Sequence, residues 1–252
     1  MANPTGTNPT GTSPTGTGLT GKRALVLGGS RGIGAAIVER LTAEGAETTF
    51  TYAGSAAAAE ALAEKTGAET LQADSADKAA VDAVIAGLES LDILVVNAGV
   101  AALGDALEMD PAQVDRMIDI NVRGPYHAAV EAARHMPAGG RIVIIGSVNG
   151  DRMPFAGGAA YALTKSAVQG MVRGLARDLG PRGITVNNVQ PGPVDTDMNP
   201  ADGPMKDQMH AFMAIQRHAE PSEVAGMVAY LVGPEAGMVT GAQHTIDGGF
   251  GA

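Results

Sequence analysis

A chain of 252 residues, 45% hydrophobic and 17% charged, is long enough to form one globular domain with a substantial core. Its 27 acidic and 17 basic side chains give a formal net charge of -10, which disfavours nucleic acid as a partner. The absence of cysteine excludes disulfides and thiolate catalysis, and the lack of any long apolar stretch leads us to expect a cytoplasmic protein without a membrane span.

The N-terminal segment repeats a five-residue unit that has no apolar face to bury. The unit reads Asn-Pro-Thr-Gly-Thr at 3–7 and 8–12, and Ser-Pro-Thr-Gly-Thr at 13–17. We predict that residues 1–20 are a disordered, low-complexity tail and that residues 21–252 form a single folded domain.

From Lys22 onward, short runs of β-branched and aliphatic residues alternate with longer alanine-rich segments of helical period. This alternation is typical of repeated βαβ units. It predicts an α/β fold of the Rossmann type, a doubly wound seven-stranded parallel sheet with helices on both faces. Ligands bind such sheets beyond the carboxyl ends of the strands. The expected strands are 24–27, 48–52, 70–73, 93–96, 142–145, 185–189 and 243–246.

A glycine-rich segment, Gly-Gly-Ser-Arg-Gly-Ile-Gly at 28–34, lies between the first strand and the first helix. Glycine permits a tight turn and close approach of a pyrophosphate to the backbone, and the N-terminus of the helix attracts phosphate. The segment predicts a dinucleotide-binding loop, with a ligand-free glycine turn as the alternative. The expected cofactor contacts are Gly28, Ser30, Arg31, Gly32, Ile33 and Gly34.

The end of the second strand favours NADPH over NADH. A site for NADH usually has a carboxylate there, about 20 residues after the glycines, to bind the ribose hydroxyl. Here the strand ends at Tyr52 and runs to Ser55, and no acid follows until Glu60. Arg31 offers a forked donor for a 2′-phosphate, unless it is only a solvated loop arginine. We assign Tyr52 and Ser55 to the same part of the cofactor site.

Two further strand ends carry residues suited to the adenosine half of the cofactor. Asp74 and Ser75 follow the third strand, where a carboxylate can accept a hydrogen bond from the adenine amino group. Asn97, Ala98 and Gly99 follow the fourth strand, and their small size would let the chain pass beside the ribose. An ordinary turn is the alternative for the second group.

The fifth strand leads to Ser147, and Tyr161 and Lys165 follow at the start of a long helix. A spacing of four puts both side chains on one helix face, so the ammonium is expected near the phenol, where it favours the ionised form. Free tyrosine titrates near pH ~10, and a fixed cation is a direct way to lower its pKa. Taken alone, such a pair is usually structural.

These motifs, in this order and spacing, resemble the short-chain dehydrogenase/reductase family from about Gly21 to the C-terminus. The resemblance implies that Ser147 positions the substrate carbonyl, Tyr161 transfers the proton and Lys165 also holds the nicotinamide ribose. It implies that Asn121 anchors a proton-relay water. It further implies a homotetramer, or a dimer. The family's carboxamide-binding segment corresponds to Pro191, Gly192, Val194 and Thr196.

Two departures from the family pattern stand out. Leu27 replaces the threonine that usually precedes the first glycine, which would loosen the internal hydrogen bonding of the loop. The interval from Ser147 to Tyr161 is slightly longer than usual, which enlarges the substrate loop over 148–160 without removing a catalytic group. The family's mobile lid would correspond to 197–215, a segment rich in methionine.

The sequence therefore predicts an NADPH-dependent reductase of ketones or other carbonyls, acting on a small molecule. A 3-oxoacyl-(acyl-carrier-protein) reductase is an alternative, although acidic carrier proteins would need a basic patch on this acidic chain. Segments 51–55, 146–154 and 245–248 also resemble a subgroup of the family, the cyclic-di-GMP-binding biofilm dispersal mediators. The five histidines show no metal-ligand spacing, so we assign no metal.

Overall fold

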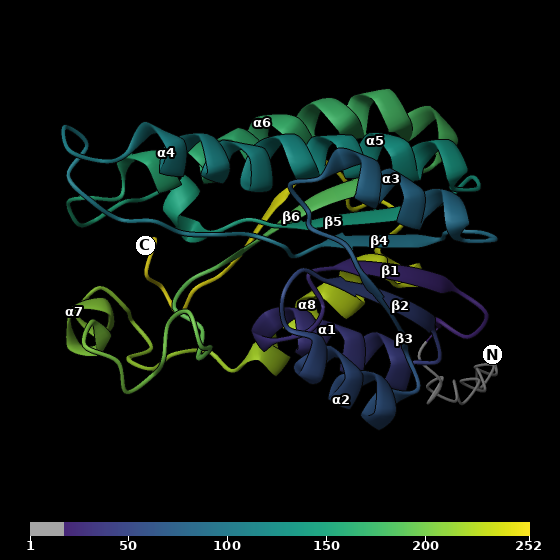
Figure 1. Cartoon of the computed structure of the whole chain (residues 1–252), viewed down its shortest axis with the longest axis horizontal. Coiled ribbons are helices and arrows are strands. Elements are labelled where there is room, and N and C mark those ends of the chain that lie inside the picture. The colour runs from purple at the N-terminus through teal and green to yellow at the C-terminus, as the bar shows by residue number, and fades with distance from the viewer. Residues whose placement is uncertain (1–17) are drawn as a thin grey trace, which may run out of the picture.

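The seven expected strands form one sheet, in the order β3-β2-β1-β4-β5-β6-β7, and every pairing is parallel (Figure 1). The computed structural model describes residues 18–252. Each strand lies within two residues of its expected bounds, so the predicted fold class is confirmed. The strands are β1 (Arg23–Leu27), β2 (Glu47–Tyr52), β3 (Glu69–Gln72), β4 (Ile93–Val96), β5 (Arg141–Ile145), β6 (Thr185–Pro191) and β7 (Gln243–Ile246).

Helices cover both faces of the sheet (Figure 1). One face is covered by α1 (Gly32–Ala43), α2 (Ala56–Thr66) and α8 (Pro221–Val232). The other face is covered by α3 (Lys78–Gly87), α4 (Pro111–Ile118), α5 (Gly124–His135) and α6 (Ala159–Leu179). A short helix, α7 (Lys206–Ala211), lies away from both layers, beyond the carboxyl edge of the sheet.

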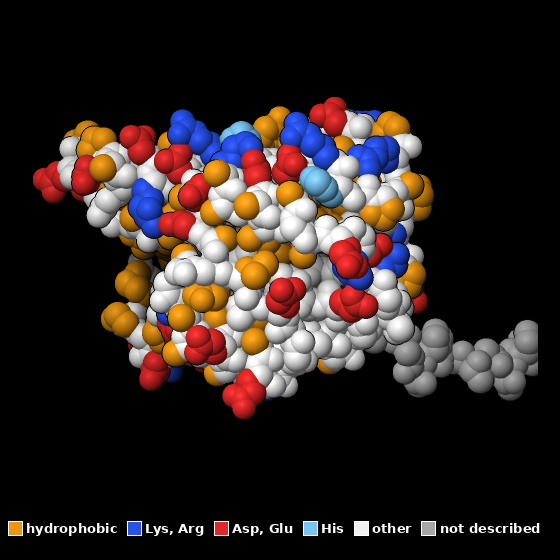
Figure 2. Space-filling view, turned by 45° about the vertical axis from the view of Figure 1, so that its right-hand side comes forward, with side chains coloured by type: hydrophobic (Ala, Val, Ile, Leu, Met, Phe, Trp, Pro, Cys, Tyr) orange, Lys and Arg blue, Asp and Glu red, His pale blue; other side chains and the backbone are white. Residues whose placement is uncertain are grey.

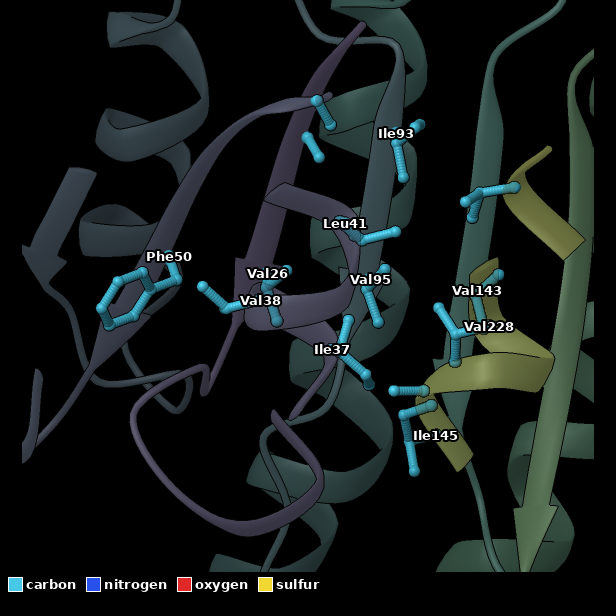
Figure 3. Packing of buried hydrophobic residues seen from close by; sticks show 14 of the residues in the cluster. Val26, Ile37, Val38, Leu41, Phe50, Ile93, Val95, Val143, Ile145 and Val228 are labelled. Atoms are coloured by element: carbon cyan, nitrogen blue, oxygen red, sulfur yellow. The ribbon is translucent and has the colours of Figure 1, made fainter. Parts of the chain in front are cut away.

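The central strands are buried on both sides, as expected of a parallel sheet between two helical layers. Val26 on β1 faces Ile37 and Leu41 of α1, and Phe50 of β2 lies in the same cluster (Figure 3). Leu25, the neighbour of Val26, joins the opposite cluster with residues of α3, α5 and α6. Side chains along β1, β4 and β5 therefore alternate between two separate cores.

The starts of the helices differ in a way that matters for ligand binding. At α3, the Asp77 carboxylate accepts hydrogen bonds from the backbone of Ala79 and Ala80, and at α4 the Asp110 carboxylate accepts one from Ala112. The start of α1 follows the glycine loop and has no side-chain cap. Its first amide groups are therefore available to an anion.

The folded domain begins earlier than expected. Leu19, which the sequence assigned to the tail, is buried in the core on the side of α1 and α8. It is the only large apolar residue between Met1 and Lys22. A single leucine forms no hydrophobic periodicity, so the sequence did not indicate that it is buried. The rest of the predicted tail, residues 1–17, lies outside the described residues. Among residues 18–252 we find no helix that is long and apolar enough to cross a membrane.

Candidate active site

The predicted site residues gather at the carboxyl edge of the sheet, where β1, β4, β5 and β6 end beside one another (Figure 1). Parallel pairing is the cause, because it brings every strand end to the same edge. Segments far apart in the sequence therefore meet at the start of α1 and α6.

The glycine loop is held from both sides at its first residue. The Gly28 amide donates to Thr51 Oγ1 at 3.1 Å, and the Gly28 carbonyl accepts from Asn97 Nδ2 at 2.7 Å. Gly28 has a φ of +77°, which favours glycine. A Cβ at Gly34 would lie 2.1 Å from the Gly28 carbonyl oxygen, so any side chain there would push α1 off the turn. The loop is closed by backbone contact that only glycine permits.

The middle of the glycine loop packs against the segment that follows β6. Ser30 is half-buried, Gly32 has a φ of +53°, and a Cβ on Gly32 would lie 3.0 Å from Thr196 Cγ2. Ile33 packs against the core below α1. The loop and Thr196 thus form one continuous rim, as expected if both contact the same cofactor.

Arg31 lies at the outer end of this rim. Its guanidinium is 3.1 Å from a carboxylate oxygen of Asp197, and both side chains are largely exposed. Tyr52 ends β2 and is half-buried against the core. Ser55 precedes α2, and its hydroxyl makes no capping hydrogen bond to that helix. An exposed ion pair of this kind contributes little stability, so Arg31 can exchange Asp197 for another anion.

Asp74, Ser75, Ala98 and Gly99 lie in turns after β3 and β4. Asp74 accepts a hydrogen bond from the Ala76 amide at 2.9 Å and keeps its side chain about half exposed. A Cβ at Gly28 would lie 2.8 Å from the backbone of Ala98. The turn after β4 therefore lies against the glycine loop, whereas the Asp74 side chain after β3 remains partly open to solvent.

Asn121 lies in a π-helical turn, Asp119–Arg123, that joins α4 to α5. Its side-chain oxygen accepts from the Val100 amide at 2.9 Å, and its Nδ2 donates to the Val100 carbonyl at 2.8 Å and to Thr164 Oγ1 at 3.1 Å. Asn121 thereby connects the end of β4 with α6. Isolated π turns occur often at functional sites, and the sequence carried no signal for this one.

Ser147, Tyr161 and Lys165 come together as predicted. The Ser147 hydroxyl lies near the Tyr161 phenol and favours its ionised form, and Lys165 Nζ lies 5.7 Å from the centre of the Tyr161 ring. Lys165 Nζ donates to the Ile145 carbonyl at 3.1 Å, and its side chain is almost wholly buried. All three groups are therefore fixed by contacts to β5, its following turn and the start of α6.

The expected lowering of the Tyr161 pKa is wrong for this structure. Burial raises the pKa of Tyr161, and the nearby Ser147 hydroxyl opposes this rise only in part. Burial also lowers the pKa of Lys165 to about 8, with no carboxylate to offset it. Desolvation penalises both charged forms, and it outweighs the attraction that the helical spacing suggested.

The chain after β6 forms the far wall of the site. The Gly192 amide donates to the Ile246 carbonyl at 3.0 Å, and Val194 is buried beside Ala219. Pro191 ends β6 and is buried, and Thr196 remains half-buried next to the glycine loop. The segment thus runs from the sheet to the loop at 28–34.

The lid segment contains a contact that the sequence did not reveal. His210 of α7 and His218, which precedes α8, lie with Nε2 and Nδ1 2.9 Å apart. Met213 is buried, whereas Met198 is 65% exposed. Among residues 18–252 we find no cluster of three or more histidine or acidic side chains suited to a metal ion.

Comparison with known proteins gives the family. A family model described as enoyl-(acyl carrier protein) reductase matches residues 28–251. The cyclic-di-GMP-binding biofilm dispersal mediator protein of Escherichia coli K12 is 66% identical over 232 residues, which cover 92% of this chain and 98% of that protein. A short-chain dehydrogenase/reductase from Serratia marcescens is 55% identical, with a TM-score of 0.90 over 93% of this chain and 100% of that one. The chain belongs to the short-chain dehydrogenase/reductase family.

A crystal structure of BdcA in complex with NADPH has the same fold. It is 65% identical to this chain, with a TM-score of 0.92 over 93% of this chain and 96% of that one. The family resemblance read from the motifs is confirmed.

The departure from the family pattern at Leu27 has a structural explanation. Leu27 is buried in the core beside α5 and α6, where a hydroxyl would gain nothing. Thr51, also fully buried, reaches across from β2 and accepts the Gly28 amide, and its carbonyl accepts the Gly29 amide at 2.8 Å. A hydroxyl from the neighbouring strand thus ties the loop that was expected to be loosened. Sequence reasoning missed Thr51 because its partner lies 23 residues earlier.

Asn149 is a second residue that the sequence did not single out. Its backbone amide donates to Ser147 Oγ at 3.1 Å, and its Oδ1 accepts from the same hydroxyl at 3.3 Å. Its Nδ2 donates to the Arg152 carbonyl at 3.1 Å. Asn149 therefore sets the direction of the Ser147 hydroxyl from within the substrate loop.

Replacing Lys165 with methionine should stabilise the fold by about 3 kcal/mol at pH 7, because a pKa lowered from 10.5 to about 8 costs about 1.4 kcal/mol per unit when the ammonium is buried. The gain should be full below pH 8 and shrink as the pH rises towards 10.5, where the unfolded chain also loses its proton. Urea unfolding at pH 7 and pH 10 would measure it. The exposed Lys206→Met is the control, and a gain that grows with pH would contradict the assignment.

Proposed function

We propose that this chain is an NADPH-dependent carbonyl reductase in which Tyr161 donates a proton to the substrate oxygen. The observation that carries this proposal is the contact between Ser147 and Tyr161, with Lys165 Nζ 5.7 Å from the ring, at the edge that also holds the glycine loop. Such convergence of a hydroxyl pair and a buried ammonium is suited to proton transfer.

The residues around the glycine loop fit a dinucleotide phosphate. The close approach of Gly34 to the Gly28 carbonyl keeps the loop tight, and the start of α1 has no side-chain cap. No carboxylate follows β2 before Glu60, and the Arg31 guanidinium is largely exposed. These features favour NADPH, and the NADPH complex of BdcA supports the choice. When bound, NADPH supplies the hydride.

The proton step follows from the environment of Tyr161. Its raised pKa keeps the phenol protonated at neutral pH, which is the form that an acid requires. Ser147 would turn its hydroxyl from Asn149 Oδ1 to the substrate oxygen and so hold it beside the phenol. Loss of the phenolic proton leaves a buried anion, which the nearby Lys165 ammonium stabilises. Asn121, fixed by Val100 and Thr164, would hold a relay water.

Turnover with a panel of ketones, diketones and acyl thioesters tests the proposal, with NADPH oxidation as the readout. We expect reduction of at least one carbonyl, with a lower Michaelis constant for NADPH than for NADH because Arg31 can pair with the 2′-phosphate. Preference for NADH would contradict the cofactor assignment.

Tyr161→Phe should abolish turnover and leave NADPH affinity within about twofold, because the ring stays and only the transferable proton is lost. NADPH fluorescence titration and steady-state rates would measure the two effects. A fully active variant would exclude Tyr161 as the acid.

Thr51→Val should weaken NADPH binding about 3- to 10-fold, because it leaves the Gly28 amide without its 3.1 Å acceptor. Thr49→Val is the matched control. Thr49 lies on the same face of β2, and its hydroxyl makes only a 3.4 Å contact with Glu69, away from the loop. Equal affinities of the two variants would show that the Thr51 hydroxyl does not hold the loop.

A signalling role is the second candidate, favoured by the 66% identity to the cyclic-di-GMP-binding mediator. The arginines near the cofactor site give it little support, because Arg31 faces Asp197 and Arg123 faces Asp119. On the face shown in Figure 2, basic side chains also lie among acidic ones. Calorimetry with cyclic-di-GMP, beside the ketone panel, separates the roles: binding without turnover would favour signalling.

Reduction of a carrier-bound 3-oxoacyl group is a narrower form of the reductase proposal. The description of the matching family model names acyl carrier protein. The net charge of -10 and the mixed charges of Figure 2 oppose docking of an acidic carrier. We therefore favour a free small-molecule carbonyl.

The exposed Tyr126 of α5 and Leu163 of α6 support the expected homo-oligomer.

A further inference from the structure

The last six residues, 247–252, lie between three segments that surround the candidate active site, and we call these six residues the wedge. The Ile215 amide of the lid donates to the Gly248 carbonyl at 2.8 Å. A Cβ at Gly192, in the wall after β6, would lie 2.7 Å from Asp247 Cα. A Cβ at Gly251 would lie 3.1 Å from Val148 Cγ2 in the substrate loop. The segment therefore touches the lid, the wall and the substrate loop at once.

Arg152 of the substrate loop clamps this segment. Its Nη1 donates to the carbonyl oxygens of Phe250 and Ala252, each at 2.7 Å. The Asp247 carboxylate curls the same residues by accepting from the Gly249 amide at 2.9 Å and the Gly251 amide at 2.7 Å. Asp151, the sequence neighbour of Arg152, accepts hydrogen bonds from Gln190 and Gln169.

Phe250 is the apolar part of the wedge. It is 2% exposed and lies in one cluster with Val148 and Met213. Its ring meets Phe212 of the lid edge-on, with centres 5.8 Å apart, and Phe155 of the substrate loop packs on the same cluster. Three of the four phenylalanines of the chain thus meet here.

The other end of Arg152 reaches the catalytic serine. Its amide donates to the Val148 carbonyl at 2.9 Å, and its carbonyl accepts from Asn149 Nδ2 at 3.1 Å. Asn149 in turn donates its amide to Ser147 Oγ at 3.1 Å. A continuous series of contacts therefore runs from the C-terminal segment through Arg152 and Asn149 to the Ser147 hydroxyl.

We propose that Arg152 is a positioning residue that uses the C-terminal segment to hold the Ser147 turn and the lid in register. The proposal rests on the proposed reductase function, in which Ser147 must meet the substrate oxygen. Both guanidinium bonds are charge-assisted, and the bond to Phe250 is partly buried. Together they resist the loop motion that would swing Asn149 and Ser147. A shift of about 1 Å in such a group can cost about 100-fold in rate.

Arg152→Met should lower kcat/KM for a ketone about 10- to 100-fold while the dissociation constant for NADPH changes less than about twofold. Hydrogen exchange of the backbone should rise over 147–155 and 212–216. Arg182→Met is the matched control, because Arg182 also donates to two backbone carbonyls, those of Ala133 and Met136, but at the opposite edge of the sheet. It should leave kcat/KM and exchange at the site unchanged.

Phe250→Ala tests whether Arg152 acts through the wedge. If it does, Arg152→Met should cost less than about threefold more in the Phe250→Ala background, because the wedge is already loose. Arg152→Lys, which keeps the charge but has a single donor head, should recover part of the lost rate, and it serves as the test variant if Arg152→Met fails to fold.

Selective loss of kcat/KM together with raised exchange at the site supports the proposal. Full additivity with Phe250→Ala, parallel loss of NADPH affinity, or unchanged rates or exchange would each overturn it. If the wild-type protein reduced no carbonyl, the reductase proposal would fail. The contact of Arg152 with the C-terminal segment would then be tested by hydrogen exchange alone: raised exchange over 147–155 and 212–216 in Arg152→Met would support it, and unchanged exchange would overturn it.

Discussion

Parallel pairing of β1 with β4 is the constraint on which the rest of the site depends. It brings Leu27 opposite Val96, so that the turns after both strands leave the sheet side by side. Asn97 can then reach the Gly28 carbonyl across the gap at 2.7 Å. The strand order changes direction between β1 and β4, because β2 and β3 lie on one side of β1 and β4 to β7 lie on the other. Helices from the two halves diverge there, which leaves the edge open to a ligand.

The half of the site to which we assign the proton step contains buried polar groups that cost stability. Lys165 sits inside the protein with the Ile145 carbonyl as its hydrogen-bond acceptor and without a carboxylate. Desolvation of that ammonium opposes folding, and two apolar cores fed by the alternating faces of the strands must offset it. The same lack of a counter-charge leaves the ammonium available to a phenolate formed at Tyr161. A carboxylate beside Lys165 would restore stability and remove that capacity.

Local sequence patterns were sufficient for the strands, the glycine loop and the Tyr161–Lys165 pair, because each depends on short-range periodicity or spacing. The bounds of α6 show this: its start at Ala159 places Tyr161 and Lys165 one turn apart on the face towards Ser147. Patterns of this kind do not report solvation. The direction of the Tyr161 pKa therefore came out wrong, since the depth of burial is a property of the packed molecule.

Three of the contacts that the sequence did not reveal join distant parts of the chain. Thr51 replaces a hydroxyl that is missing at position 27, Asn121 depends on a π-helical turn, and Arg152 pairs with backbone carbonyls about 100 residues later. Carbonyl acceptors leave no trace in the identity of the residue that carries them, so Arg152 could not be matched to its partners from composition or charge. The effect on the site is nonetheless specific. Thr51 and Asn97 fix where the loop begins, and Arg152 and Asn149 fix where the Ser147 hydroxyl points. The two halves of the site are thus positioned by different long-range contacts, so the proposed cofactor binding and the proposed proton step should be separable by mutation.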